Sequence, residues 1–195
     1  GAAFVLQPVL QWVVLPYGFR TIATRSIDAM KDLELKEGDR VVVLSSSEFA
    51  PAVYGTTLLA ELRLPRPATW HVWSMALLPV EVRRTGERQV ELEVLGGRMV
   101  ESVFEENFRS DAFPLAAGHR VALNGAAVTV LAVDAGKPTK LRVDLERPPE
   151  DFVYVWWNGD TYERVALPDV GQSRVFPKTQ TILERVLQGR RDEAS

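Results

Sequence analysis

The sequence predicts an α+β protein in which a small βαβ unit packs with a predominantly antiparallel β-meander or sandwich, with a helix near each end. Three observations predict this fold. Residues 41–43 form a β-branched run that precedes a helical segment and a second strand. The Asn-Gly dipeptides at 124–125 and 158–159 supply the positive φ angles of tight hairpin turns. Between them, residues 140–146 alternate apolar and charged side chains, as a half-buried strand does.

The composition is that of an ordinary globular protein and excludes several classes of function. A chain of 195 residues can bury one sizeable core or two small ones. The net charge is −3 and the basic residues are scattered, whereas duplex nucleic acid requires a concentrated cationic face. The sequence contains no cysteine, which excludes disulfides, thiolate catalysis and zinc–thiolate sites. No signal peptide with a charged first region is present. Because the basic residues are scattered and no cofactor motif is found, we expect neither nucleic acid nor a cofactor as partner.

The first element is an uncharged stretch over residues 1–19. Its length approaches the ~20 residues that span a bilayer, but two glutamines and two prolines weaken that interpretation. Trp12 and Tyr17 are suited to a membrane boundary, where Arg20 and Arg25 follow as cations. Two interpretations stay open: a buried irregular segment, or the end of a membrane helix or an interfacial segment.

The next elements form the predicted βαβ unit. Residues 19–33 have helical period, with Met30 and Leu33 on the apolar face. A strand is predicted over 40–44 and a helix from 51 to 63. A second strand is predicted over 68–76, so the two strands are expected to be parallel.

The rest of the chain is rich in strand signals. Residues 80–84 and 88–95 alternate around the turn at 85–87, which predicts a hairpin. Residues 152–157 are apolar or aromatic throughout, so this strand is either covered on both faces or exposes a tryptophan-rich surface. Residues 179–187 predict an amphipathic helix that turns Ile182 inward.

These elements suggest four parts along the chain. They are an apolar N-terminal segment and amphipathic helix over 1–33, the βαβ part over 34–78, an antiparallel β-rich part over 79–177, and a C-terminal helix with a charged tail over 178–195.

The best-placed polar cluster for binding is Ser45-Ser46-Ser47-Glu48, where the first strand meets the following helix. Ligands bind at this position in α/β units, and free N–H groups at a helix N-terminus favour an anion. The alternative interpretation is structural, because Ser45 and Glu48 have the spacing of a capping box. The glycine-rich loop and the lysine of a phosphate loop are both missing.

A serine-dependent hydrolase is the catalytic alternative, with Ser47 as nucleophile and His71 or His119 as base. Both histidines lie in predicted strands, and the small-residue elbow that exposes a nucleophile is missing. Two histidines without metalloprotease spacing do not predict a zinc site, so no catalytic or metal-ligating residue is assigned.

The second candidate binding feature is aromatic. Trp156 and Trp157 are consecutive in a strand and therefore point to opposite faces, so one of them leaves any single core. With Tyr162 nearby, the outward ring could form a platform for a sugar, a peptide or a membrane surface, or it could be covered by another part of the chain.

The turn and proline placement of the chain resembles a known family. Gly-Lys-Pro-Thr at 136–139, Asp-Leu-Glu-Arg-Pro at 144–148, Trp-Trp-Asn-Gly at 156–159 and the Pro-x-x-Gly at 168–171 resemble the C-terminal soluble domain of uncharacterised polytopic bacterial membrane proteins. The resemblance covers residues 38–177 and implies that 1–19 end a membrane region. It assigns no functional residues, and the C-terminal helix departs from the pattern.

The sequence therefore predicts a non-catalytic soluble recognition or assembly domain of a bacterial membrane protein. Its alternatives are the serine hydrolase and a small anion or nucleotide binder at the Ser45–Glu48 loop. The membrane and other protein subunits are the expected partners, and the bacterial cell membrane is the expected location. The charges around residues 20–32 are mixed and do not select one side.

Overall fold

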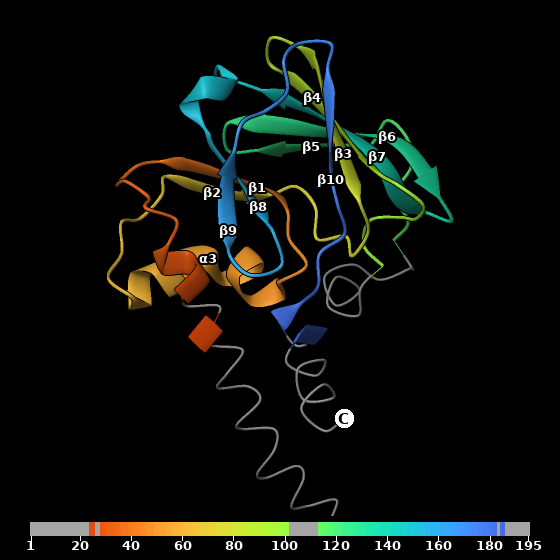
Figure 1. Cartoon of the computed structure of the whole chain (residues 1–195). Helices are drawn as coiled ribbons and strands as arrows, with labels where there is room; N and C mark the ends of the chain where they lie inside the picture. The colour runs from red at the N-terminus through yellow and green to blue at the C-terminus, as the bar shows by residue number, and fades with distance from the viewer. Residues whose placement is uncertain (1–23, 26–27, 102–112, 183, 186–195) are drawn as a thin grey trace, which may run out of the picture.

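The structure is a computed structural model that describes residues 24–25, 28–101, 113–182 and 184–185. Two β-sheets and a helical layer make up the molecule, which confirms the predicted α+β class (Figure 1). The strands are β1 (Arg40–Ser45), β2 (Thr69–Val72), β3 (Val80–Gly86), β4 (Gln89–Val94), β5 (Arg120–Leu123), β6 (Ala126–Asp134), β7 (Lys137–Leu145), β8 (Val153–Trp157), β9 (Tyr162–Val165) and β10 (Ser173–Phe176).

The α-helical segments lie on the side of sheet A that faces away from sheet B (Figure 1). The longest described helix is α3 (Phe49–Glu61), and a short 3-10 turn, η2 (Pro149–Asp151), precedes β8. Residues 24–25 and 28–31 are also helical, and a further helix begins at Ile182. Met30 and Leu33 are buried, as the helical period predicts. The uncharged stretch over 1–19 lies outside the described residues, as do residues 20–23, 26–27, 183 and 186–195 of the predicted helices and tail. No helix in the described part of the chain is both long and apolar enough to cross a bilayer.

One sheet, which we call sheet A, has the strand order β2-β1-β8-β9. β1 runs parallel to both of its neighbours, and α3 connects it to β2, so the predicted βαβ unit is confirmed. Val41, Val42 and Val43 are fully buried, because helices cover one face of β1 and the second sheet covers the other. The β-branched run at residues 41–43 thus forms a strand that is covered on both faces.

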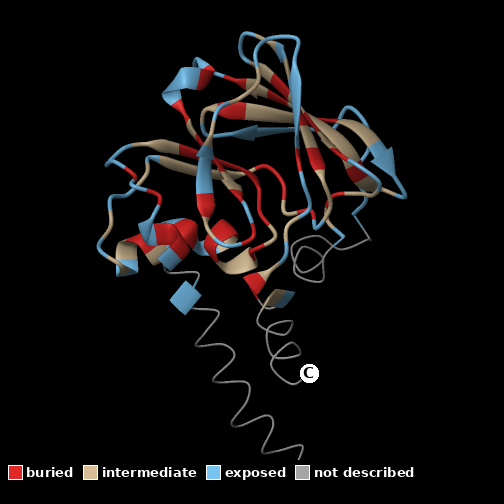
Figure 2. Ribbon diagram, in the orientation of Figure 1, coloured by how far each residue is buried: buried red, intermediate tan, exposed pale blue. Residues whose placement is uncertain are grey.

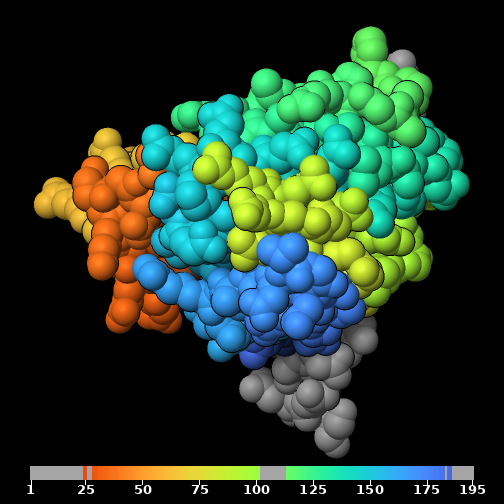
Figure 3. Space-filling model, turned by 90° about the horizontal axis from the view of Figure 1, so that it is seen from above, coloured from red at the N-terminus to blue at the C-terminus, as the bar shows by residue number. Residues whose placement is uncertain are grey.

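The second sheet, sheet B, has the order β10-β3-β4-β7-β6-β5 and is antiparallel throughout. Asn124 and Gly125 form the two-residue turn between β5 and β6, with Gly125 at a φ of +86°, as the dipeptide predicts. In β7 the alternation buries Val143 and Leu145 and turns the charges outward. Figure 3 shows the outer side of the molecule, where residues of β3 and β4 lie between β10 and β6–β7.

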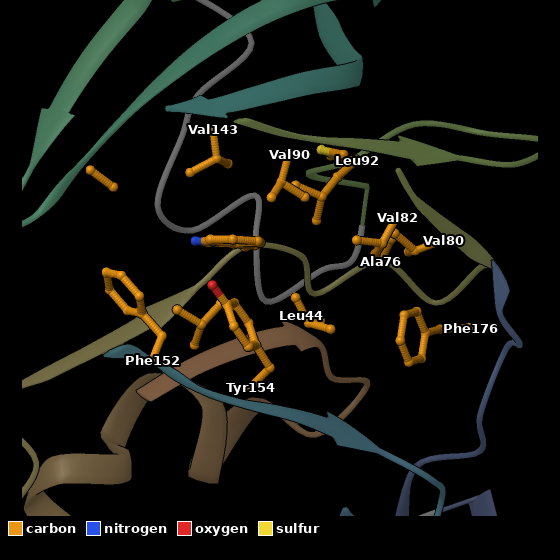
Figure 4. Close-up of a cluster of buried hydrophobic side chains, with 14 of the residues drawn as sticks. Leu44, Ala76, Val80, Val82, Val90, Leu92, Val143, Phe152, Tyr154 and Phe176 are labelled. Atoms are coloured by element: carbon orange, nitrogen blue, oxygen red, sulfur yellow. The ribbon is translucent and has the colours of Figure 1, made fainter. Parts of the chain in front are cut away.

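Two separate cores hold the three layers together (Figure 2). The inter-sheet core lies between sheets A and B, and Figure 4 shows side chains from both sheets pointing into it. Its central members are Val42, Leu44, Trp73, Val82, Leu92, Val143, Phe152, Tyr154 and Phe176. The helix-side core lies between sheet A and the helices, and its members include Met30, Leu33, Val41, Val43, Leu59, Val155, Trp157, Tyr162 and Ile182.

The two sheets do not divide at the predicted boundary between residues 78 and 79. β8 and β9 belong to the predicted β-rich part, yet they complete sheet A, where Val42 of β1 pairs with Tyr154 of β8. The reason is that β8 is apolar on both faces and is stable only in the middle of a sheet that is covered on both sides.

Candidate functional site

The predicted polar loop and the predicted aromatic strand end at the same place. Because β1 and β8 are parallel neighbours, their carboxyl ends lie side by side, and Ser45 pairs in register with Trp156. This arrangement brings the residues Ser46, Ser47 and Glu48 close to Trp157 and Tyr162. The structure therefore joins two candidate features that the sequence analysis treats separately, and we call this place the strand-end junction.

Residues 179–182 of the chain itself cover the strand-end junction. The Ser47 hydroxyl lies 3.2 Å from the Thr179 hydroxyl, and it also donates to the Gln180 carbonyl oxygen over 3.3 Å. The same carbonyl oxygen accepts a hydrogen bond of 3.3 Å from the indole N–H of Trp157. The ligand position of the βαβ unit is thus filled by backbone from near the end of the chain.

Beneath this cover, Ser46 has a structural role. Its hydroxyl lies 2.8 Å from the Tyr162 hydroxyl and accepts a hydrogen bond of 3.1 Å from the backbone N–H of Glu48. Both side chains are buried, and burial raises the pKa of Tyr162 above its ordinary value. Ser45, the last residue of β1, is buried as well. The hydroxyls of Ser46 and Tyr162 therefore bond to each other at the strand ends instead of facing solvent.

The capping box predicted from Ser45 and Glu48 is not present in the structure. Glu48 stands at the N-cap position of α3, but no side chain caps that helix. The Glu48 carboxylate instead accepts a hydrogen bond from the backbone N–H of Ile182, at the start of the C-terminal helix. Burial raises the pKa of Glu48, the Ile182 hydrogen bond opposes this shift, and the nearby charge of Glu184 adds to it. The carboxylate therefore occupies the position that an external anion would take at that helix end.

The tryptophan platform is also corrected by the structure. Trp157 is 0% exposed and packs in the helix-side core, with its ring 5.2 Å from that of Tyr162. Trp156 points to the other face, as its position in the strand predicts, and its ring lies 5.5 Å from Phe176 beside the inter-sheet core. Sheet B and the helices cover the two faces of β8, so neither ring forms an open platform.

Neither histidine contacts a serine of the loop among the described residues. His71 lies on the edge strand β2, where its Nε2 is 2.8 Å from the carbonyl oxygen of Asn124. His119 lies beside β5 in the other sheet. Within the described part of the chain, no three His, Asp or Glu side chains lie close enough together to hold a metal ion. The described geometry provides no base for Ser47.

A second feature, which the sequence analysis missed, is an apolar cavity of about 340 Å³ between the edge of sheet A and the inner face of sheet B. We call it the inter-sheet cavity. The residues that line it are Val72, Trp73, Ser74, Met75, Met99, Val100, Leu115, His119, Val121, Leu123, Val128, Val130, Pro138 and Leu141. Among the described residues, no Asp, Glu, Lys or Arg lines it. In the sequence, the alternation of Val121 and Leu123 indicates only that they share one face of a strand; their exposure is seen in the structure.

Comparison with known proteins adds no relative. No family model, curated protein or solved structure matches this chain. The described residues define a three-layer α+β protein with a closed strand-end junction and an apolar cavity between its sheets.

Proposed function

We propose that the chain is a non-catalytic recognition or assembly domain of a bacterial membrane protein. The observation that supports this function best is the closure of the strand-end junction by residues 179–182. Ser46, Ser47 and Glu48, which the two alternative functions would use, lie there and already bond to the chain itself. The inter-sheet cavity is lined by apolar side chains from both sheets and is the domain's candidate recognition site.

The alternatives require groups that the described geometry does not supply. An anion at the strand-end junction would face the buried Glu48 carboxylate, and like charges repel strongly where water is excluded. A hydrolase would need an imidazole within hydrogen-bond reach of Ser47, whose hydroxyl is engaged by Thr179 and Gln180. Recognition through an apolar surface requires neither group.

The position of the helical layer supports attachment to a membrane. The described residues nearest the apolar segment, 24–25 and 28–31, lie on the helical side of sheet A (Figure 1). Sheet B lies on the opposite side. Attachment through residues 1–19 would thus set the helices toward the bilayer and leave sheet B accessible to a partner.

Vesicle flotation tests this proposal with the full chain. We expect the chain to float with vesicles of phosphatidylethanolamine and phosphatidylglycerol, and a Leu10→Glu/Val13→Glu variant to remain in the buffer, because buried charges oppose insertion. The control is a Val170→Glu variant, which places one charge at an exposed position in the connection between β9 and β10. This variant should still float. Flotation that is absent in the wild type, or equal in all three proteins, would remove the membrane part of the proposal.

Covalent labelling tests the non-catalytic part. A serine-reactive phosphonate should leave Ser45, Ser46 and Ser47 unmodified in the folded protein, because no imidazole of the described residues is hydrogen-bonded to their hydroxyls. Stoichiometric labelling at any of the three would instead establish an activated serine and favour the hydrolase.

A further inference from the structure

The strand-end junction holds residues 179–182, which we call the docked segment, as a binding site holds a peptide. The Ser47 hydroxyl and the Trp157 indole N–H both donate to the Gln180 carbonyl oxygen, each over 3.3 Å. These bonds come from side chains of the protein body and reach the main chain of the docked segment. In peptide recognition, hydrogen bonds to the main chain supply affinity whatever the sequence of the peptide.

An aliphatic side chain supplies the specificity of this contact. The Glu48 carboxylate accepts a hydrogen bond from the main-chain N–H of Ile182, whose side chain is 2% exposed and packs in the helix-side core. Gln180, in contrast, is exposed, so its side chain does not determine what binds. Pockets for particular side chains make a peptide site specific. The junction therefore selects a segment with an aliphatic residue two positions after the carbonyl group that it binds.

A basic residue makes a third contact beside the junction. The Arg185 guanidinium donates to the Gly159 carbonyl oxygen and lies 2.8 Å from the Asp160 carboxylate, both in the turn between β8 and β9. Because the Asp160 side chain is exposed, this ion pair contributes more to orientation than to affinity. A complete occupant thus carries an arginine three positions after its aliphatic residue.

The connection that leads to the docked segment is short and loosely held. Only Pro177 and Lys178 lie between the end of β10 and residue 179, and both are exposed. Neither forms a main-chain hydrogen bond with another described residue. A change in their backbone angles would carry the docked segment away from the body without breaking either sheet. Identical chains can exchange a terminal element of this kind and so form a dimer.

The junction is unfavourable when it is empty. Without an occupant, the buried Glu48 carboxylate would lose its hydrogen bond to Ile182, and the Trp157 indole would lose its acceptor. A replacement must offer the same carbonyl, N–H and aliphatic side chain at the same spacing. A second copy of this chain offers all three, since it contains the same segment.

We propose that the strand-end junction binds the docked segment of a second copy of this chain as well as its own, so that two chains are joined by exchange of residues 179–185. This inference rests on the proposed function, because it gives the assembly role a partner. It depends neither on membrane attachment nor on the inter-sheet cavity.

Disulfide trapping tests the exchange in the full chain, which contains no cysteine of its own. The hydroxyls of Ser47 and Thr179 lie 3.2 Å apart, so cysteines at these two positions are close enough to be linked. Ser47→Cys and Thr179→Cys chains, one of them isotope-labelled, are mixed and oxidised. Each chain has a single cysteine, so a disulfide between positions 47 and 179 joins two chains. Mass spectrometry of the linked peptides identifies it.

The matched control mixes Ser47→Cys with Val170→Cys, whose cysteine lies at an exposed position outside the docked segment. We expect the disulfide between positions 47 and 179 to be at least about tenfold more abundant than that between 47 and 170, which forms only by random collision. A chain that carries both Ser47→Cys and Thr179→Cys should form the disulfide within itself at low concentration. This result shows that the substitutions leave the segment docked.

A competing peptide tests the chemical class of the occupant. A synthetic peptide of residues 177–185, in excess over the two single-cysteine chains, should reduce the disulfide between positions 47 and 179. The same peptide with Ile182→Asp should compete at least about tenfold more weakly, because it would bring a charge into the helix-side core.

The inference is overturned if the disulfide between positions 47 and 179 is no more abundant than the control, or if the wild-type peptide leaves it unchanged. The double-cysteine chain overturns it too if no disulfide forms within that chain, since the segment would then lie elsewhere. These results differ from a failure of the proposed function. Chains that are linked in the mixture but do not float with vesicles lose their membrane role and keep the exchange, and chains that float without being linked do the opposite.

Discussion

The Glu48 carboxylate accepts a hydrogen bond from the backbone N–H of Ile182, 134 residues further along the chain. The first N–H groups of a helix have no partner within the helix, and a negative charge near them is favourable. Glu48 therefore caps the C-terminal helix although it stands at the start of α3. The Ile182 side chain is buried in the helix-side core, so this residue is held both by a polar and by an apolar contact.

Glu48→Ala should destabilise the fold by removing this cap. The substitution leaves the Ile182 N–H without its acceptor, and we expect the free energy of unfolding to fall by about 1–3 kcal/mol. Glu48→Gln keeps an acceptor oxygen and should lose less. Urea denaturation of the three proteins measures the difference. Glu61→Ala, at an exposed position of α3, removes the same charge as a control and should change stability by no more than about 0.5 kcal/mol.

The same carboxyl group makes stability depend on pH. Burial raises the pKa of Glu48 above its ordinary value of 4.5 in the folded protein, so the native state binds its proton more tightly than the unfolded state does. The contribution of this group is fully present below pH 4.5 and is lost as the pH rises through its folded-state pKa. Glu48→Gln cannot titrate. The stability of the wild type relative to this variant should therefore decrease from acid toward neutral pH, and an increase would mean that the folded-state pKa is lowered.

Trp157→Ala tests whether this ring belongs to the core. The ring is fully buried in the helix-side core, and its N–H bonds to Gln180, so truncation should reduce the free energy of unfolding by about 3–5 kcal/mol. Val170→Ala, at an exposed position, is the control and should have an effect within about 0.5 kcal/mol. Wild-type stability of the Trp157→Ala protein would show that the ring does not contribute to the core.

Local sequence patterns predicted the elements of the fold because each pattern depends on nearby residues. Backbone geometry alone accounts for three of these predictions. They are the strand at Val41–Val43, the turn at Asn124-Gly125 and the opposite orientation of Trp156 and Trp157. Local sequence patterns do not predict in the same way which strands will pair. The pairing of β1 with β8 joins distant segments, and both strands are so uniformly apolar that their partners are not specified locally.

For the same reason, the sequence predicted only part of the candidate site. The loop after β1 and the end of β8 were each found from the sequence, but the segment that covers them comes from residues 179–182. Glu48 has the spacing of a capping partner for Ser45, and its actual partner, Ile182, is distant in sequence. The inter-sheet cavity is lined by residues from the end of β2 and from β5, β6 and β7, and no single strand encodes such an arrangement.

Gly55→Ala should destabilise α3 although alanine is the better helix former. A Cβ at Gly55 would overlap the ring of Trp70, whose indole N–H is fixed by a hydrogen bond of 2.8 Å to Ala52. The propensity gain of about 1 kcal/mol is offset by overpacking that costs about 1–3 kcal/mol. Thr56→Ala is the neighbouring control, and because its side chain is exposed it should be neutral or slightly stabilising. A Gly55→Ala protein that melts higher than the wild type would show that Trp70 can move.

Two buried tyrosine hydroxyls of sheet A should respond in opposite ways to the same substitution. The Tyr162 hydroxyl lies 2.8 Å from that of Ser46, so Tyr162→Phe should lower the free energy of unfolding by about 0.5–1.5 kcal/mol. The Tyr154 hydroxyl points into the inter-sheet core (Figure 4) and has no partner among the described residues. Tyr154→Phe should therefore be neutral or stabilising, because it removes a buried polar group whose desolvation nothing offsets.

Each of these variants is the other's control, since both remove one oxygen and leave the aromatic ring in place. Urea denaturation under one set of conditions compares them directly. Equal losses would mean that the Tyr154 hydroxyl has acquired a partner in solution, and the inter-sheet core would then contain ordered water. A loss only in Tyr162→Phe would assign the stability of the strand-end junction to its hydroxyl network and that of the inter-sheet core to apolar packing alone.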